Sequence, residues 1–305
     1  MDDLNLDKNN IEDILSLIRR YMAIAGENGI KGFKMDDLKN LENKICRELS
    51  SLLEVSLPNT NTPYHHLVNW ISSISRPNAV EIFTTNYDLL LEQALEECGV
   101  AYFDGFTGGR RSLFDLKSIE EDLMPLHHAR LWKIHGSINW YFDSGQICRM
   151  SGDIPDDPRL IYPSHLKYDQ SRKMPYMAFL NRLESYIKEE SSFLIMSGYS
   201  FSDQHINNTI INALRSNPTS AALVLLFDEL DNYDYVQDVN VPNLSFWARD
   251  KAIIGTKEEK WEIGQSAGNL IFDEYYVDNN DEINSQLGDF SKLGHLLNSL
   301  KKIND

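Results

Sequence analysis

The sequence has few cysteines and no long apolar stretch, and both deficits limit what the protein can be. Its three cysteines, Cys46, Cys98 and Cys148, are odd in number and lie about fifty residues apart. They suggest neither a disulfide framework nor a CxxC zinc site, and they are typical of a reducing compartment. The longest apolar run, 221–227, has seven residues, whereas a transmembrane helix needs about 20. We therefore expect no membrane span.

Basic residues are also scarce. The chain has 29 Lys and Arg against 46 Asp and Glu, which gives a net charge of −17. Proteins that grip duplex nucleic acid over a wide face use Lys and Arg to neutralise phosphates. The composition therefore disfavours direct nucleic-acid binding, and leaves only local basic patches such as 109–111. Residues 1–10 are acidic and polar, unlike a signal peptide, so we expect a cytoplasmic protein.

The remaining composition is typical of a folded globular protein. Hydrophobic residues make up 42% and aromatic residues 10% of the 305 residues, which is too rich for a disordered chain. This length allows one large domain or two of ordinary size, and either can bury a sizeable core.

The first part of the chain, 1–78, is predicted to be a helical subdomain. Three segments are predicted to be helices. Apolar residues recur at helical spacing in 11–25 and 35–55, and a helix start signal precedes 64–75. Thr62 is the expected N-cap of the third helix, and Pro63 is its first residue.

From residue 79 the pattern changes to short apolar runs separated by helical stretches. The runs are 79–85 (AVEIFTT), 129–137 (ARLWKIHGS), 191–200 (SSFLIMSGYS) and 220–229 (SAALVLLFDE). Such continuous runs fit strands buried on both faces, as in a parallel sheet. We expect a helix from Tyr87 to Cys98, and others over 178–188 and 203–215.

These elements predict an α/β fold with a doubly wound, Rossmann-like parallel sheet and a helical subdomain. The core spans 79–230, and strands and a helix within 231–305 complete it. Two segments rich in turn residues, 104–115 and 142–159, are expected to be long loops.

Polar residues follow three of the predicted strands, where ligands bind in open parallel sheets. The residues of interest are Thr85, Asn86 and Asp88 after the first strand, His135 after the second, and Gly198, Ser200 and Asp203 after the third. Each group alone has a simpler explanation. The first could be a helix N-cap cluster, a single histidine is more often structural, and the third could be an ordinary turn. Together they suggest one shared polar cleft.

The segments FTTNYD (83–88), KIHGSINW (133–140) and SGYSFSDQHI (197–206) resemble the sirtuin-like superfamily. They look closest to bacterial sirtuin-like NAD hydrolases of antiphage defence, including those that work with a HerA-type ATPase. FDGFTGG (103–109) and LIYPSHLKY (160–168) are similar to segments of the same branch.

The resemblance implies an enzyme that cleaves NAD, its substrate, to nicotinamide and ADP-ribose. Asn86 would position a water near the nicotinamide ribose, and His135 would accept a proton. Asp88 would orient Asn86 or contact the ribose. Gly198 and Ser200 match the turn that holds the adenosine half. Thr85 and Asp203 are the remaining expected NAD-binding residues.

This chemistry suits these residue types. Breaking the nicotinamide–ribose bond builds an oxocarbenium-like centre. An amide can align water without being consumed, and a neutral imidazole is a suitable base near pH 7. The resemblance also implies a homo-oligomer, with a HerA-type ATPase as a further partner.

The sequence departs from the family in two places. The family opens with a strand and a Gly-Ala-Gly-x-Ser turn that receives the NAD pyrophosphate, and this motif is absent. Gly26, Gly29 and Gly32 follow a predicted helix and are interpreted as a C-cap and loop. We expect a trimmed chain, a misassigned start codon, or a natural variant whose partner supplies the missing part. A catalytically silent subunit is therefore the alternative function.

Metal-dependent deacetylation is not expected either. The paired CxxC zinc motif of deacetylating sirtuins is absent. The adjacent histidines 65–66 and 127–128 would point apart on a helix or strand, so no metal site is predicted.

Overall fold

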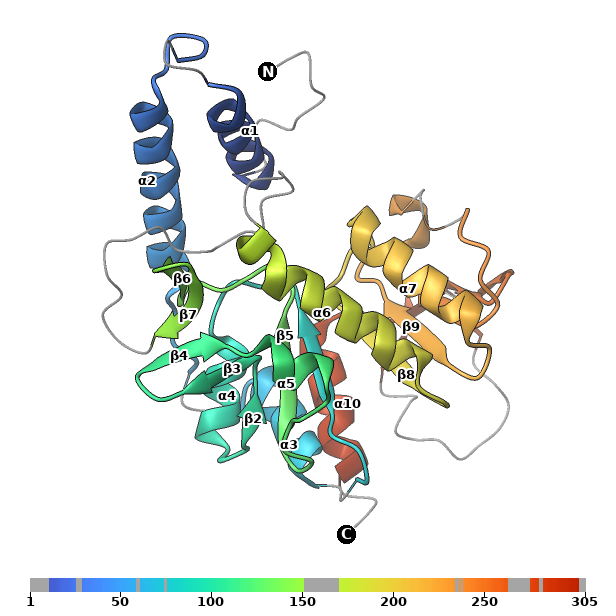
Figure 1. Cartoon of the computed structure of the whole chain (residues 1–305). Helices are drawn as coiled ribbons and strands as arrows, with labels where there is room; N and C mark the ends of the chain where they lie inside the picture. Colours follow the sequence, from blue (N-terminus) through green and yellow to red (C-terminus); the bar gives the residue numbers. More distant parts are fainter. Residues whose placement is uncertain are drawn as a thin grey trace. The chain divides into compact units, whose positions relative to one another are not determined.

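The computed structural model describes residues 11–25, 29–58, 61–73, 76–150, 170–233, 236, 238–262, 275–279 and 282–301 (Figure 1). The chain divides into two compact units. The first contains residues 1–56, 78–93 and 101–179, and the second contains residues 57–77, 94–100 and 180–305. Each unit has sheets of its own. The division into domains at 78 and 230 stays a prediction.

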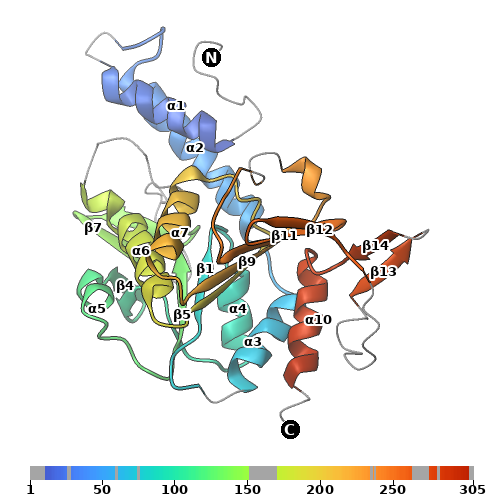
Figure 2. The ribbon, with the colours of Figure 1, turned by 90° about the vertical axis from the view of Figure 1, so that its right-hand side faces the viewer.

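The first unit begins with two helices, as the apolar spacing predicts. They are α1 (Ile11–Ile24) and α2 (Met35–Leu53), and they lie side by side in Figures 1 and 2. Gly29 and Gly32 lie between them and have positive φ angles of 71° and 86°. This confirms that these two glycines belong to a loop after a helix. Gly26 lies outside the described residues.

A three-stranded parallel sheet follows in the first unit. Its order is β1 (Glu81–Thr84), β5 (Ala129–Lys133) and β2 (Tyr102–Phe103). All five residues of β5 are buried, which confirms the expectation from its apolar run, whereas β1 is half-buried throughout. Helix α4 (Leu90–Glu97) begins three residues later than predicted, because residues 85–89 form a turn.

The described residues of the two predicted long loops, 104–115 and 142–150, are instead largely β-structure. An antiparallel sheet of the order β3-β4-β7-β6 is formed by β3 (Phe106–Gly108), β4 (Arg111–Phe114), β7 (Gln146–Met150) and β6 (Trp140–Asp143). Residues 109–110 and 144–145 form the tips of the two hairpins, and aromatic side chains pack between the strands. The ring of Phe106 packs on those of Phe114 and Trp140. The loop prediction is therefore wrong for 106–108, 111–114 and 146–150. Residues 151–159 lie outside the described part.

Phe179 anchors the aromatic core of the first unit. Its side chain is fully buried and contacts the rings of Phe114, Trp132 and Trp140. Gly105 has a φ of +89°, and a Cβ there would come within 2.9 Å of the Phe179 ring. The chain therefore needs glycine at 105 for both backbone and packing reasons. Helix α5 (Leu116–Glu120) follows β4.

The second unit contains a five-stranded sheet of the order β12-β11-β10-β9-β8. Strands β8 (Phe193–Ser197), β9 (Ala221–Leu225) and β10 (Leu244–Trp247) are parallel. Strands β11 (Lys251–Ile254) and β12 (Lys257–Lys260) extend it in antiparallel fashion. Helix α6 (Gln170–Lys188) leads into the unit, and α7 (Gln204–Ser216) joins β8 to β9.

The expectation that β8 is buried on both faces is wrong. Phe193 and Ile195 are 52% and 43% exposed. Among the described residues, β8 is the last strand of its sheet and pairs with one strand, β9, so a side chain on it has fewer neighbours than one on a central strand.

Helices α3 (Pro63–Ser73) and α10 (Phe290–Lys301) lie side by side in the second unit (Figures 1 and 2). The amide of His65 donates to Thr62 Oγ1 over 3.4 Å, which confirms Thr62 as the cap. A short hairpin, β13 (Tyr276–Asn279) and β14 (Glu282–Ser285), and a 3₁₀ turn, η1 (Leu230–Asn232), complete the unit. The fold is therefore α/β with parallel strands, as predicted.

None of the helices among the described residues is long and apolar enough to cross a membrane.

Candidate functional site

The turns after β1 and β5 are tied together by hydrogen bonds. The amide of Ile134 donates to the carbonyl of Thr84 over 2.9 Å. The amide of Ile138 and the hydroxyl of Ser137 both donate to the carbonyl of Tyr87, over 3.1 and 3.4 Å. Because β1 and β5 are adjacent and parallel, their carboxyl ends meet at one edge of the sheet. The segments that carry Asn86 and His135 are thereby held side by side.

The turn after β1 has a defined internal geometry. The amide of Asn86 donates to Thr84 Oγ1 over 3.1 Å, and the amide of Leu90 donates to Asp88 Oδ1 over 3.0 Å. The side chain of Asn86 is exposed, while Thr85 and Asp88 are half-buried. Asp88 therefore helps to start α4, as the capping alternative predicts. Its role toward Asn86 or a ribose stays a prediction.

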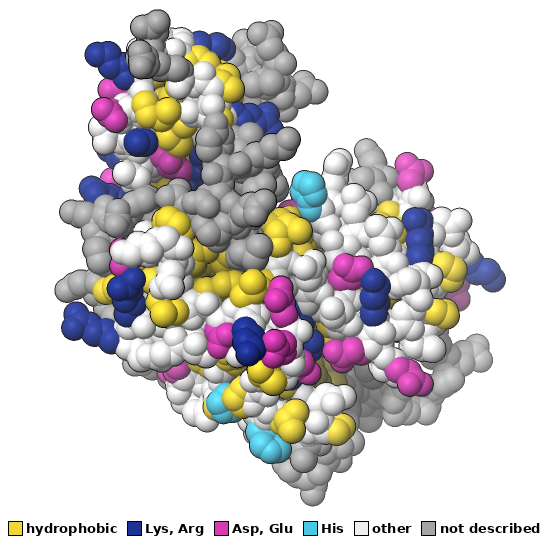
Figure 3. Space-filling view, in the orientation of Figure 1, with side chains coloured by type: hydrophobic (Ala, Val, Ile, Leu, Met, Phe, Trp, Pro, Cys, Tyr) yellow, Lys and Arg dark blue, Asp and Glu magenta, His cyan; other side chains and the backbone are white. Residues whose placement is uncertain are grey.

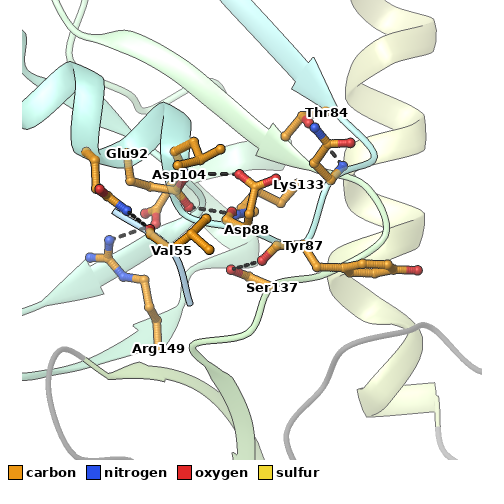
Figure 4. Close-up of polar contacts among 12 residues, drawn as sticks. Val55, Thr84, Tyr87, Asp88, Glu92, Asp104, Lys133, Ser137 and Arg149 are labelled. Carbon is orange, nitrogen blue, oxygen red and sulfur yellow. Dashed lines mark hydrogen bonds and ion pairs between the residues drawn. The ribbon is translucent and has the colours of Figure 1, made fainter. Parts of the chain in front are cut away.

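His135 is half-buried, and its ring centroid lies 6.3 Å from that of Tyr87. Tyr87 packs against the apolar cluster around Leu15 and Cys46 on α1 and α2. Figure 4 shows its ring pointing away from the charged residues of the site. Helices α1 and α2, which we call the helical pair, therefore contact the turn that carries Asn86.

A buried lysine beneath these turns is a residue that sequence reasoning missed. Lys133 is the last residue of β5 and is 2% exposed. Its ammonium donates to Glu92 Oε1 over 2.9 Å and to the carbonyl of Asp88 (Figure 4). The available signal was a lysine at the end of a predicted buried strand, since buried lysines are paired.

A second buried charge lies close by. Burial raises the pKa of Asp104 from its usual 3.8 to about 6, although Arg149 and the amide of Phe106 oppose the rise. Arg149 Nη1 lies 2.8 Å from Asp104 Oδ2. The negative charge of Glu92 adds to the rise in the pKa.

This raised pKa predicts a pH-dependent stability. Between pH 3.8 and about 6, the folded state holds the Asp104 proton more tightly than the unfolded chain does. The free energy of unfolding therefore falls as pH rises through this window, by up to about 3 kcal/mol. The side chain of Asn in Asp104→Asn does not titrate, so this contribution to the pH dependence is absent from the variant. Between pH 4 and pH 7, the free energy of unfolding of the variant should rise relative to that of wild type by about 2 to 3 kcal/mol in urea unfolding. A difference between the two proteins that does not change with pH would contradict the shift.

The predicted residues after β8 lie in the second unit. Gly198 and Ser200 are exposed, and Gly198 has a φ of +67°. Ser200 Oγ lies 2.8 Å from Ser202 Oγ. Asp203 Oδ1 accepts from the amides of His205 and Ile206, over 2.9 and 3.1 Å, and so caps α7. Thus the structure brings Asn86 and His135 together in one unit, and Gly198, Ser200 and Asp203 together in the other.

The side chain of Ser197, at the end of β8, is notable in the same turn. Its hydroxyl is buried and has no hydrogen-bond partner among the described residues. Buried hydroxyls are normally bonded, so this turn has an available polar group beside Gly198. A Cβ added at Gly198 would meet no atom within 4 Å, so the space beside its backbone is open.

No group of three or more His, Cys, Asp or Glu is placed to bind a metal within the part of the chain that the structure describes. The two adjacent histidines on α3 have separate partners: His65 Nε2 lies 2.7 Å from Glu97 Oε2, and the His66 ring packs on that of His295. The expectation of a site without metal stays a prediction. Cys46, Cys98 and Cys148 are not joined by a disulfide.

Residues 80–243 match the family model for the SIR2-like domain, which is more than half of the 305 residues. The chain belongs to the SIR2-like domain family. The matched part begins at β1 and includes all three turns that carry the predicted site residues. SIR2-like domains bind NAD, so the function of this SIR2-like chain is related to NAD. No curated protein matches it. The similar segment at 160–168 lies outside the described residues.

Proposed function

We propose that this SIR2-like chain hydrolyses NAD at the nicotinamide–ribose bond and releases nicotinamide and ADP-ribose. The observation that carries the proposal is the pair of tied turns that present Asn86 and His135 at the ends of two adjacent parallel strands. Ligands bind at this edge of open parallel sheets. The proposal joins that geometry to membership of an NAD-binding family.

In the proposed reaction, the exposed amide of Asn86 holds the attacking water beside the ribose. His135 accepts a proton from that water or from a ribose hydroxyl. Departure of nicotinamide leaves an oxocarbenium-like centre, so attack by water completes the hydrolysis. One carboxylate oxygen of Asp88 accepts a hydrogen bond from the amide of Leu90. In this proposal Asp88 therefore acts mainly by fixing the conformation of the turn.

The turn after β8 is proposed to hold the adenosine half through Gly198 and Ser200. Asp203 already places a carboxylate at the N-terminus of α7. This negative charge occupies the position that would otherwise attract a phosphate. A ribose hydroxyl, which can donate a hydrogen bond, is a better partner for Asp203 than the pyrophosphate is.

The proposed biological role is antiphage defence by depletion of NAD, in the cytoplasm. A homo-oligomer and a HerA-type ATPase partner belong to the same proposal, and they rest on the resemblance of the three motifs. The charge distribution agrees with a partner other than nucleic acid. On the face in Figure 3, Lys and Arg side chains are dispersed among Asp and Glu.

A catalytically silent subunit is the second candidate function. It is favoured by one observation: among the described residues, Gly29 and Gly32 lie between two helices, and no Gly-x-Gly-x-Ser turn is present in the sequence. In this case the chain would assemble with a partner that supplies the missing phosphate contacts.

The deciding experiment measures nicotinamide release from NAD by the purified chain and by Asn86→Ala. We expect turnover by wild type and none above background by the variant, because the water then has no amide to align it. Asn40→Ala, an exposed asparagine on α2, is the matched control and should retain full activity. Absence of turnover by wild type would favour the silent subunit. Full activity in Asn86→Ala would overturn the assignment.

A further inference from the structure

Lys133 has a place in the site that its burial alone does not explain. We infer that Lys133 is a positioning residue, whose ammonium fixes the turn that carries Asn86 and thereby sets the geometry of NAD cleavage. The inference rests on the proposed function, because Asn86 is assigned its role there.

The register of the sheet places Lys133 where the turn begins. Lys133 is paired with Thr84, the last residue of β1. From there its side chain reaches the carbonyl of Asp88, at the other end of the turn (Figure 4). One side chain on the neighbouring strand therefore binds the far end of the turn that β1 leads into.

Three carbonyls of this turn are held from one segment, 133–138. The carbonyl of Thr84 accepts from Ile134, and that of Tyr87 accepts from Ile138 and Ser137. The carbonyl of Asp88 accepts from the Lys133 ammonium. The other donors are two backbone amides and the short side chain of Ser137, whereas Lys133 donates from the end of a long side chain. The carbonyl of Asp88, two residues before α4 begins, therefore depends on a lysine for its contact with β5.

The chemistry of this position requires a cation with several donors. An ammonium can donate three hydrogen bonds, and here two of them go to Asp88 and Glu92. A charge in a buried site needs a compensating charge, which Glu92 supplies. Its other oxygen, Oε2, is buried and has no hydrogen-bond partner among the described residues. This agrees with a carboxylate that serves mainly as the counter-charge for Lys133.

The rival explanation is that Lys133 only stabilises the fold. A variant that removes both charges separates the two explanations, because the single variant Lys133→Met leaves Glu92 buried and unpaired. The double variant Lys133→Met/Glu92→Met replaces the ion pair with apolar groups, and such replacements often preserve stability. It still removes the donor to the Asp88 carbonyl.

The test measures kcat and KM for NAD together with amide hydrogen exchange. In the double variant we expect kcat to fall by about 10- to 100-fold, since small displacements of a catalytic group have effects of this size. KM should change little. Exchange at Ile134 and Ile138, whose amides bind the turn carbonyls, should become at least about tenfold faster as the turn opens more often.

A matched control lies at the other end of the same strand pair. Arg130→Met/Glu81→Met removes a buried ion pair of 2.9 Å between β5 and β1, away from the turn. It also removes the bond from Trp132 Nε1 to Glu81 and the contact of Arg130 with Asp122, so it perturbs the strand pair at least as much as the double variant does. It should leave kcat unchanged, and likewise the exchange at Ile134 and Ile138.

The possible results are distinguishable. Unchanged kcat and unchanged exchange in a folded double variant would overturn the positioning role and leave the proposed function intact. If wild type releases no nicotinamide, the proposed function fails. The positioning role in NAD cleavage then fails with it, and the exchange measurement still shows whether Lys133 fixes the turn: unchanged protection says that it does not, and faster exchange says that it does.

Discussion

Nicotinamide release by His135→Ala is expected to be about 10² to 10⁴ times slower than release by wild type, the usual effect of losing a general base. His135 follows β5 directly, and the hydrogen bonds from Ile134 and Ile138 hold its turn against the turn of Asn86. Alanine leaves these backbone bonds in place. The loss should therefore appear in kcat, while the free energy of unfolding changes little, because the side chain is only half-buried.

The measurement is steady-state nicotinamide release at saturating NAD, with urea unfolding of the same preparations. His127→Ala is a suitable control, since His127 is exposed and lies two residues before the start of β5. It should be as active as wild type. A His135→Ala protein that unfolds at the wild-type urea concentration but keeps full activity would exclude His135 as the base.

Lys133→Met is expected to lower the free energy of unfolding by about 3–5 kcal/mol, the usual cost of breaking a buried ion pair from one side. Lys133 and Glu92 have side chains 2% and 11% exposed. The variant leaves the Glu92 carboxylate without its cation, and Asp104 places a second buried acid in the same region. Both features make the unpaired charge costly.

Urea unfolding at pH 7 measures this cost, and the double variant with Glu92→Met provides the comparison. Stability should largely return when both charges are removed, because no buried charge then remains unpaired at this pair. Equal losses in the single and double variants would show that lost packing, not the unpaired carboxylate, causes the effect.

Features with local causes could be predicted from the sequence. Thr62 and Pro63 mark the start of α3 because capping and a fixed proline φ act within one turn. The apolar run of β5 likewise indicates a fully buried strand. The polar residues that follow β1 and β5 do lie at one edge of a parallel sheet, since strand direction determines where strand ends meet.

Features that depend on distant partners could not be predicted. The segment 104–115 has the composition of a loop, yet β3 and β4 form because Phe106 and Phe114 find aromatic partners elsewhere in the chain. The exposure of Phe193 follows from strand order, which no local pattern contains. Lys133 was missed for the same reason, since its partners lie 41 and 45 residues away.

The packing of Tyr87 has a consequence for how this protein can be shortened. Its ring lies against the cluster formed by Leu15 and Cys46, so α1 and α2 cover one side of the residue next to Asn86. Deleting the two helices would expose an aromatic ring to water and remove the support of the turn on that side. The helical pair is therefore not a detachable appendage, and an inactive truncation would not show that α1 or α2 contacts the substrate.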